Sequence, residues 1–344
     1  MSLRSLLPVA LAAGGVLALS ACGVQAPAAG DGPTTAASTS GSSLPPFLDL
    51  VERAKDTTAF RGTRRVSSIS EMQVMEVVED VGADGTGAFA IELVEAVSLL
   101  PGTDPLSFPV THENAARFQW QMRDFRIWSL QRASVNYLID VLPDAPVVAG
   151  IPCERVEFQR ISSPVGRPGH FEADIDPNTG FVLAWRELGD QGQPIIESTF
   201  ETFAYGGDVS DMTLRDRTFS AQVLDLNAEL SSQVGGDVFV PDVFPQGFEL
   251  VGGELLTIPS LPSLGTSAII QAGDWVRFLA SDGIETVSFA HGVTQAVSTS
   301  ALGDLRVVSL GLWEVGFGEL AGVKFVVAGR TKADGLASIV QSAF

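Results

Sequence analysis

The sequence has 344 residues, of which 45% are hydrophobic and only 18% are charged, with 35 glycines and 19 prolines. This composition excludes a disordered chain and predicts a turn-rich globular protein. The formal net charge of −20 argues against binding to nucleic acid or to anionic lipid headgroups, and favours either a basic partner or a salty environment.

The first 21 residues have the pattern of a secretory signal peptide. Arg4 precedes an apolar run from Leu6 to Leu19, which is too short and too lightly flanked for a membrane-spanning helix. The run ends in Leu19-Ser-Ala-Cys22-Gly, which resembles the bacterial lipobox, in which the cysteine becomes the acylated N-terminus. The alternative is an ordinary cleavage site with a chance cysteine. We expect Cys22 to carry the lipid that anchors the mature protein to a membrane outside the cytoplasm.

Residues 22–43 then form a flexible tether, since residues 23–43 are mostly Ala, Gly, Pro, Ser and Thr. If Cys22 is acylated, Cys153 is the one remaining thiol, so no disulfide forms within the chain. We expect Cys153 to be a half-buried strand residue. About 300 residues follow the tether, which suggests two domains.

The predicted first domain, residues 44–207, opens with a helix and continues in strands. Ser43, Pro45 and Pro46 predict a helix start, and apolar residues follow at helical spacing up to Ala54. Strand-like runs follow at residues 65–81, 86–97, 117–123, 135–141, 153–161 and 195–205.

A β-hairpin at residues 171–185 should lie in the middle of this sheet. Its two arms alternate between apolar and polar residues, and Asp176-Pro-Asn-Thr-Gly180 supplies the turn. A single antiparallel sheet of this length curls. Its inner face could enclose an apolar ligand, although a filled core is the simpler interpretation. The residues expected on that face are Phe118, Trp120, Met122, Phe171, Ile175, Leu183 and Trp185.

Polar residues 208–239 are predicted to link the domains, with weak helical character from Val223 to Leu230. Residues 240–344 predict a smaller α+β domain. It should contain a hairpin at 275–289 with Asp282-Gly283 at its turn, a strand at 323–328, and a closing helix after Thr331.

The sequence shows no pattern typical of catalysis, of a metal site or of a cofactor. His112, His170 and His291 have neither metal-ligand nor triad-like spacing, and we expect them at the surface or in turns. The sequence predicts a binding protein, not an enzyme.

Six segments resemble, in their order and spacing, the RseB/MucB family of periplasmic sigma-factor regulators. The segments are residues 148–156, 176–183, 192–200, 244–248, 281–289 and 324–330. The resemblance implies a LolA-like half-barrel followed by a small α+β domain. It also implies that the second domain binds the extracytoplasmic segment of an anti-sigma factor, and that a lipid in the half-barrel causes release. The alternative is a lipid or lipoprotein carrier of the LolA/LppX type. A carrier needs only the half-barrel, so the second domain favours the regulator.

Overall fold

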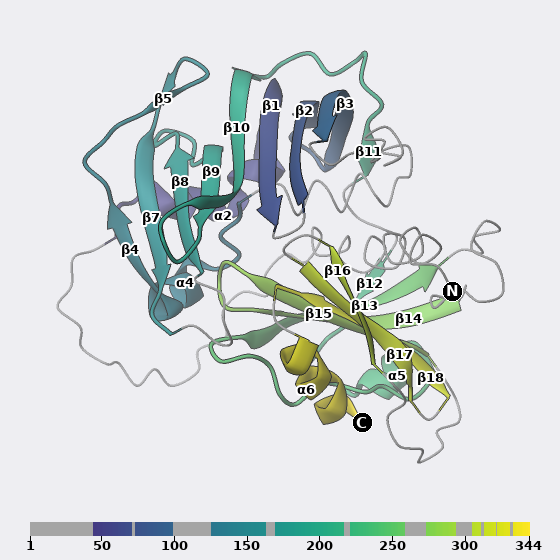
Figure 1. The fold of residues 1–344 in the computed structure, drawn as a ribbon. Coiled ribbons are helices and arrows are strands. Elements are labelled where there is room, and N and C mark those ends of the chain that lie inside the picture. The colour runs from purple at the N-terminus through teal and green to yellow at the C-terminus, as the bar shows by residue number, and fades with distance from the viewer. Residues whose placement is uncertain are drawn as a thin grey trace.

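The computed structural model describes residues 44–70, 73–98, 125–162, 169–216, 221–258, 273–293, 305–310, 313–320, 322–330 and 333–344. Cys22, the tether, Phe118, Trp120, Met122, His112 and Thr331 lie outside these ranges. The described residues form two large antiparallel sheets and one two-stranded pair, with few helices (Figure 1). The predicted α+β fold with a large curved sheet is confirmed.

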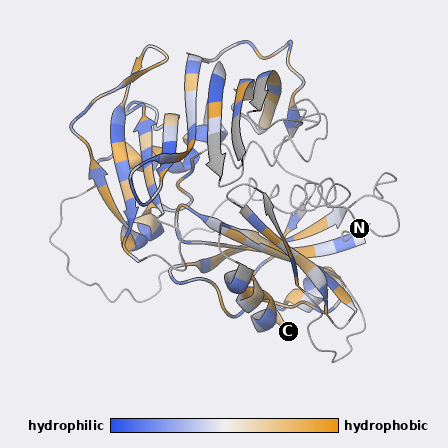
Figure 2. Cartoon of the chain, in the orientation of Figure 1, coloured by the Kyte–Doolittle hydropathy of each residue, from blue (hydrophilic) through white to orange (hydrophobic). Residues whose placement is uncertain are grey.

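The first sheet has nine strands in the order β11-β3-β2-β1-β10-β9-β8-β7-β4 among the described residues. Its strands are β1 (Ala59–Ser70), β2 (Gln73–Asp84), β3 (Ala88–Ser98), β4 (Tyr137–Val141), β7 (Glu154–Arg160), β8 (His170–Ile175), β9 (Val182–Leu188), β10 (Pro194–Tyr205) and β11 (Arg215–Asp216). A short pair, β5 (Val147–Val148) and β6 (Ile151–Pro152), lies beside them. Along these strands hydrophilic and hydrophobic residues alternate (Figure 2), as expected for a sheet with one buried face.

The second sheet has, within the described ranges, seven strands in the order β12-β13-β14-β15-β18-β17-β16. Its strands are β12 (Ala221–Val223), β13 (Glu249–Ile258), β14 (Gly273–Ser281), β15 (Thr286–Gly292), β16 (Arg306–Leu310), β17 (Trp313–Leu320) and β18 (Val323–Gly329). The closing helix α6 (Ala333–Ala343) buries Leu336, Ile339 and Val340 against this sheet, as the helical spacing predicts.

Helix α2 (Leu48–Thr57) packs on the inner face of the first sheet. It begins three residues later than the predicted start at Pro45, because Pro46 and Phe47 form a turn in which Pro45 O accepts from Leu48 N at 3.1 Å. Leu48, Val51 and Ala54 are its buried residues. A helix on one face of a curved antiparallel sheet is the half-barrel that the pattern predicts.

The predicted hairpin is confirmed as β8 and β9, in the interior of the first sheet. Asp176 Oδ1 accepts from the backbone N–H of Asn178 at 2.9 Å, and Thr179 Oγ1 donates to Asp176 Oδ2 at 3.0 Å. Gly180 has φ +74, and a Cβ there would lie 2.5 Å from Leu50 Cβ. Glycine at this position therefore serves both the turn and the close approach of α2.

Three predicted elements are wrong. The run at residues 65–81 is two strands, β1 and β2, which pair antiparallel with Ser70 opposite Gln73, and the sequence around these two residues has no Gly, Pro or Asn of the kind that marks most turns. Residues 135–141 begin in helix α4 (Leu130–Asn136), which Ser129 caps by accepting from Arg132 N at 3.3 Å. The stretch 223–230 is not helical, since β12 ends at Val223 and helix α5 occupies Leu230–Val234.

The crossing between the sheets lies between Asp216 and Ala221, inside the predicted linker. Strand β11 pairs with β3 of the first sheet, and β12 pairs with β13 of the second. The predicted domain bounds, residues 44–207 and 240–344, stay a prediction.

Candidate functional site

The interior of the half-barrel holds a small cavity between α2 and the inner face of the sheet. Its volume is about 30 Å³, which is room for a water molecule but far too little for an acyl chain. The lining residues come from α2, β1, the chain entering α4, the turn between β8 and β9, β9 itself and β10: Val51, Glu52, Lys55, Phe60, Phe125, Arg126, Gly180, Phe181, Val182, Leu183, Trp185, Ser198 and Phe200.

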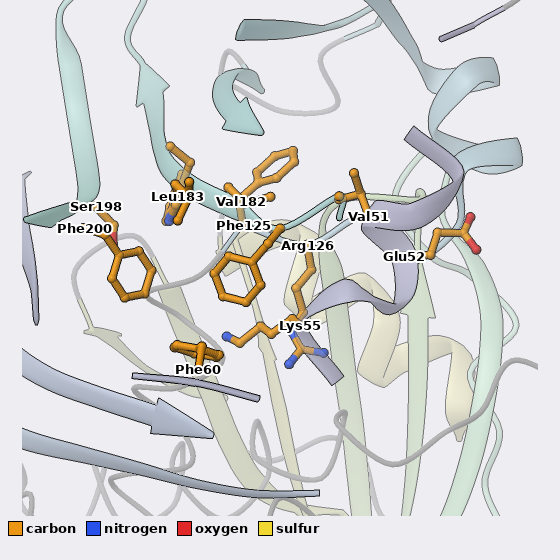
Figure 3. A pocket seen from close by; sticks show the side chains of 13 residues that line it. Val51, Glu52, Lys55, Phe60, Phe125, Arg126, Val182, Leu183, Ser198 and Phe200 are labelled. Atoms are coloured by element: carbon orange, nitrogen blue, oxygen red, sulfur yellow. The ribbon is translucent and has the colours of Figure 1, made fainter. Parts of the chain in front are cut away.

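The cavity is aromatic inside and charged at its rim. Figure 3 shows Lys55 reaching from α2 toward the rings of Phe60 and Phe125, while Glu52 points away from them. The Arg126 guanidinium lies 5.6 Å from the Trp128 ring centroid and bonds weakly to Asp56, at 3.3 Å.

Two of the predicted pocket residues line the cavity, and two are packed in the core beside it. Leu183 and Trp185 are lining residues. Phe171 and Ile175 are buried in the same hydrophobic cluster as Trp185, together with Phe125. The inner face is therefore apolar as predicted. In this structure it is close to a filled core, and the cavity must widen before it can hold an acyl chain.

A buried ion pair on the inner face was missed by the sequence analysis. Arg64 Nε donates to Glu79 Oε2 at 3.0 Å, and both side chains are at most 1% exposed. Burial lowers the pKa of Arg64 to about 9. No sequence signal marks the pair, because the two residues belong to strands that were predicted as one run.

The second sheet reaches the half-barrel through the turn between β14 and β15, residues 282–285. Gly283 O accepts from Trp128 N at 2.8 Å. Ile284 packs into the half-barrel core with Phe171 and Trp185. The predicted Asp282-Gly283 turn is thus confirmed. Its neighbour Ile284 is buried in the core of the first sheet.

A buried polar network surrounds this turn. Tyr137 Oη donates to Asp282 Oδ2 at 2.7 Å, and Arg160 donates to Asp282 and, at 2.6 Å, to Glu285. Burial, with the nearby Glu285, raises the pKa of Tyr137 well above its usual value. Removing one partner of such a network is costly, because it leaves a buried charge uncompensated.

Arg330 extends the network to strands β8 and β9 of the half-barrel. Its guanidinium donates to Glu187 Oε2 at 2.8 Å and lies 5.9 Å from the ring centroid of Phe171. Phe171 is one of the predicted pocket residues. Arg330, directly after β18, therefore contacts the core cluster that also holds the cavity residue Trp185.

The cysteine and the two histidines in the described part of the chain each sit among contacts that belong to the fold. The Cys153 thiol is buried in a hydrophobic cluster just before β7, and burial raises its pKa to about 11. His291 was predicted at the surface or in a turn, and this prediction is wrong. The residue is fully buried in β15. His170 lies at the start of β8, and its Nε2 is 2.6 Å from Glu157 Oε1. Within the described part of the chain, no helix is long and apolar enough to cross a membrane.

Comparison with known proteins finds similar structures but no similar sequence. No protein-family model and no curated protein matches the chain. MucB in the Pseudomonas aeruginosa MucA/MucB complex is similar, with a TM-score of 0.46 and 14% identity over 85% of this chain and 95% of that one. MucB in complex with MucA(peri) gives a TM-score of 0.46 and 14% identity over 86% and 96% of the two chains. A LolA superfamily protein from Nitrosomonas europaea gives a TM-score of 0.20 and 8% identity over 50% and 93%. These likenesses concern the fold alone.

Proposed function

We propose that this chain is a lipid-anchored extracytoplasmic regulator. It binds the extracytoplasmic segment of an anti-sigma factor, and an acyl-chain ligand in its half-barrel changes that binding. The six-segment resemblance to RseB/MucB supports the type of partner. The net charge of −20 supports a basic partner segment.

One observation carries the regulatory part of the proposal. Ile284, at the tip of the second sheet, packs in the same cluster as Phe171 and Trp185. A ligand that widens the cavity beside Trp185 must repack this cluster, because cores are close-packed. Repacking then acts on the turn at 282–285 and, through it, on the second sheet.

Binding of the partner tests the proposal against the carrier alternative. The probe is the extracytoplasmic segment of an anti-sigma factor from the same organism, sought first as a single-span protein encoded beside this chain, and titrated into the mature chain by calorimetry. A regulator binds the segment with one-to-one stoichiometry. A carrier binds a fluorescent fatty acid and leaves the segment unbound, and that result would contradict the regulator.

The membrane anchor has its own test. Mass spectrometry of the mature N-terminus should find an acylated Cys22, and Cys22→Ala should abolish acylation. An unmodified terminus at another residue would contradict the anchor without affecting partner binding.

A further inference from the structure

The outer face of the half-barrel carries a row of charged residues in register across five strands. Asp140 on β4 lies opposite Glu157 on β7, Glu157 opposite Glu172 on β8, Glu172 opposite Arg186 on β9, and Arg186 opposite Glu197 on β10. This row lies on the face opposite the cavity, since the neighbouring Phe158 and Phe171 are buried inside. It plays no part in the proposed function.

The row is short of positive charge at one end. Arg186 lies between Glu172 and Glu197, and its Nε donates to Glu172 Oε2 at 2.6 Å. The other end has three carboxylates in succession, from Asp140 to Glu172. Like charges directly opposite one another on neighbouring strands destabilise a sheet. A cation bound at that end would remove the repulsion.

A nitrogen ligand stands beside these carboxylates. One ligand atom each from Glu157, His170 and Glu172 lie within 4.8 Å of one another. Their side chains are 27%, 23% and 14% exposed, so the group is partly shielded yet open to an ion from solvent. Arg186 bonds to Oε2 of Glu172, and the ion would take the other oxygen.

We infer that Glu157, His170 and Glu172 form a binding site for a divalent transition-metal ion, with Zn²⁺ as the probe of choice. One imidazole and two carboxylates suit Zn²⁺, whereas Mg²⁺ and Ca²⁺ take oxygen ligands alone. The ligands lie on the adjacent paired strands β7 and β8, which hold them more rigidly than loops would. The bound ion takes the place of the contact between His170 Nε2 and Glu157 Oε1 and links the two strands. This inference revises the expectation from sequence that the chain has no metal site, because only the sheet register brings the three residues together.

Calorimetric titration of Zn²⁺ into the tag-free mature chain tests the site. One ion should bind per chain, and binding should raise the Tm by about 5 °C when free Zn²⁺ is 100 times the Kd. His170→Gln keeps a donor for Glu157 but removes the imidazole, and it should weaken Zn²⁺ binding by about tenfold or more. Ca²⁺ should bind with no dependence on His170.

Glu197→Gln is the matched control, because it removes one charge from the same row without removing a ligand. It should change the Zn²⁺ affinity by less than about threefold. Equal losses in the two variants would show a diffuse charge effect, and no loss in either would place the ion elsewhere. Either outcome, or no binding at millimolar Zn²⁺, overturns the site.

Discussion

Leu183 is the residue that best reports whether the half-barrel interior is filled. It is 1% exposed and belongs to a cluster with Phe60, Phe181 and Phe200. Leu183→Ala should therefore lower the free energy of unfolding by about 2 to 5 kcal/mol, the cost of a cavity in a packed core. Denaturant melts measure this. A clearly smaller loss together with weakened fatty-acid binding would instead show that Leu183 lines an open pocket.

His291 should make stability depend on pH. Its Nε2 accepts from Phe239 N at 3.1 Å, and burial lowers its pKa to about 4. The unfolded chain, with a histidine pKa of about 6.5, then binds more protons than the folded chain between about pH 4 and pH 6.5. Stability therefore falls as pH falls through this window, by about 2 kcal/mol between pH 7 and pH 5.

The matched variant for this effect is His291→Gln, which keeps an acceptor for Phe239 N but does not titrate. Urea melts at the two pH values should give a smaller pH dependence for the variant than for the wild type. An equal dependence would mean that other groups are responsible.

Single residues also mark what sequence could predict. The residues from Asp176 to Gly180 make a turn through contacts with one another, so local sequence was sufficient. Arg64 and Glu79 pair across two strands, and their burial depends on the whole sheet. In the sequence, the residues next to Arg64 and Glu79 are of the same kind as those next to an ordinary exposed charge on a strand.

Among the elements, the turn between β14 and β15 packs closely against the backbone of α4. Gly283 has φ +107, and a Cβ there would clash with the backbone N of Ala133 in α4. Gly283→Ala should destabilise the protein by about 2 kcal/mol or more, through strain and through displacement of the turn. Gly235→Ala is a control, because Gly235 has φ +73 but no atom within 4 Å of an added Cβ. If the two changes cost the same, the contact with α4 contributes nothing.

Element type was predictable where periodicity was long and turn residues were present. The hairpins of β8 with β9 and of β14 with β15 are confirmed, as is α6. The prediction failed at the β1–β2 reversal, where no turn residue stands, and at α4, which has only seven residues. Short helices and turns without Gly or Pro depend on packing that sequence does not display.

At the scale of the whole molecule, the two sheets share one polar network. Arg160 bonds to Glu285 across a sequence separation of 125 residues, and Arg330 bonds to Glu187 across 143. Contacts so distant have no signature in a single sequence. Two sheets were predictable from the pattern. The burial of the turn at 282–285 in the core of the first sheet was not.

In the proposed regulation, a ligand in the half-barrel alters binding of the anti-sigma segment through the turn at 282–285. The direct test measures the Kd of the extracytoplasmic segment with and without saturating oleic acid, in the wild type and in Ile284→Ala. In the wild type the segment should bind about tenfold or more weakly when oleic acid is bound. In Ile284→Ala the effect should shrink, because the turn no longer fills the core. An unchanged Kd in the wild type, with oleic acid shown to be bound, would contradict the account.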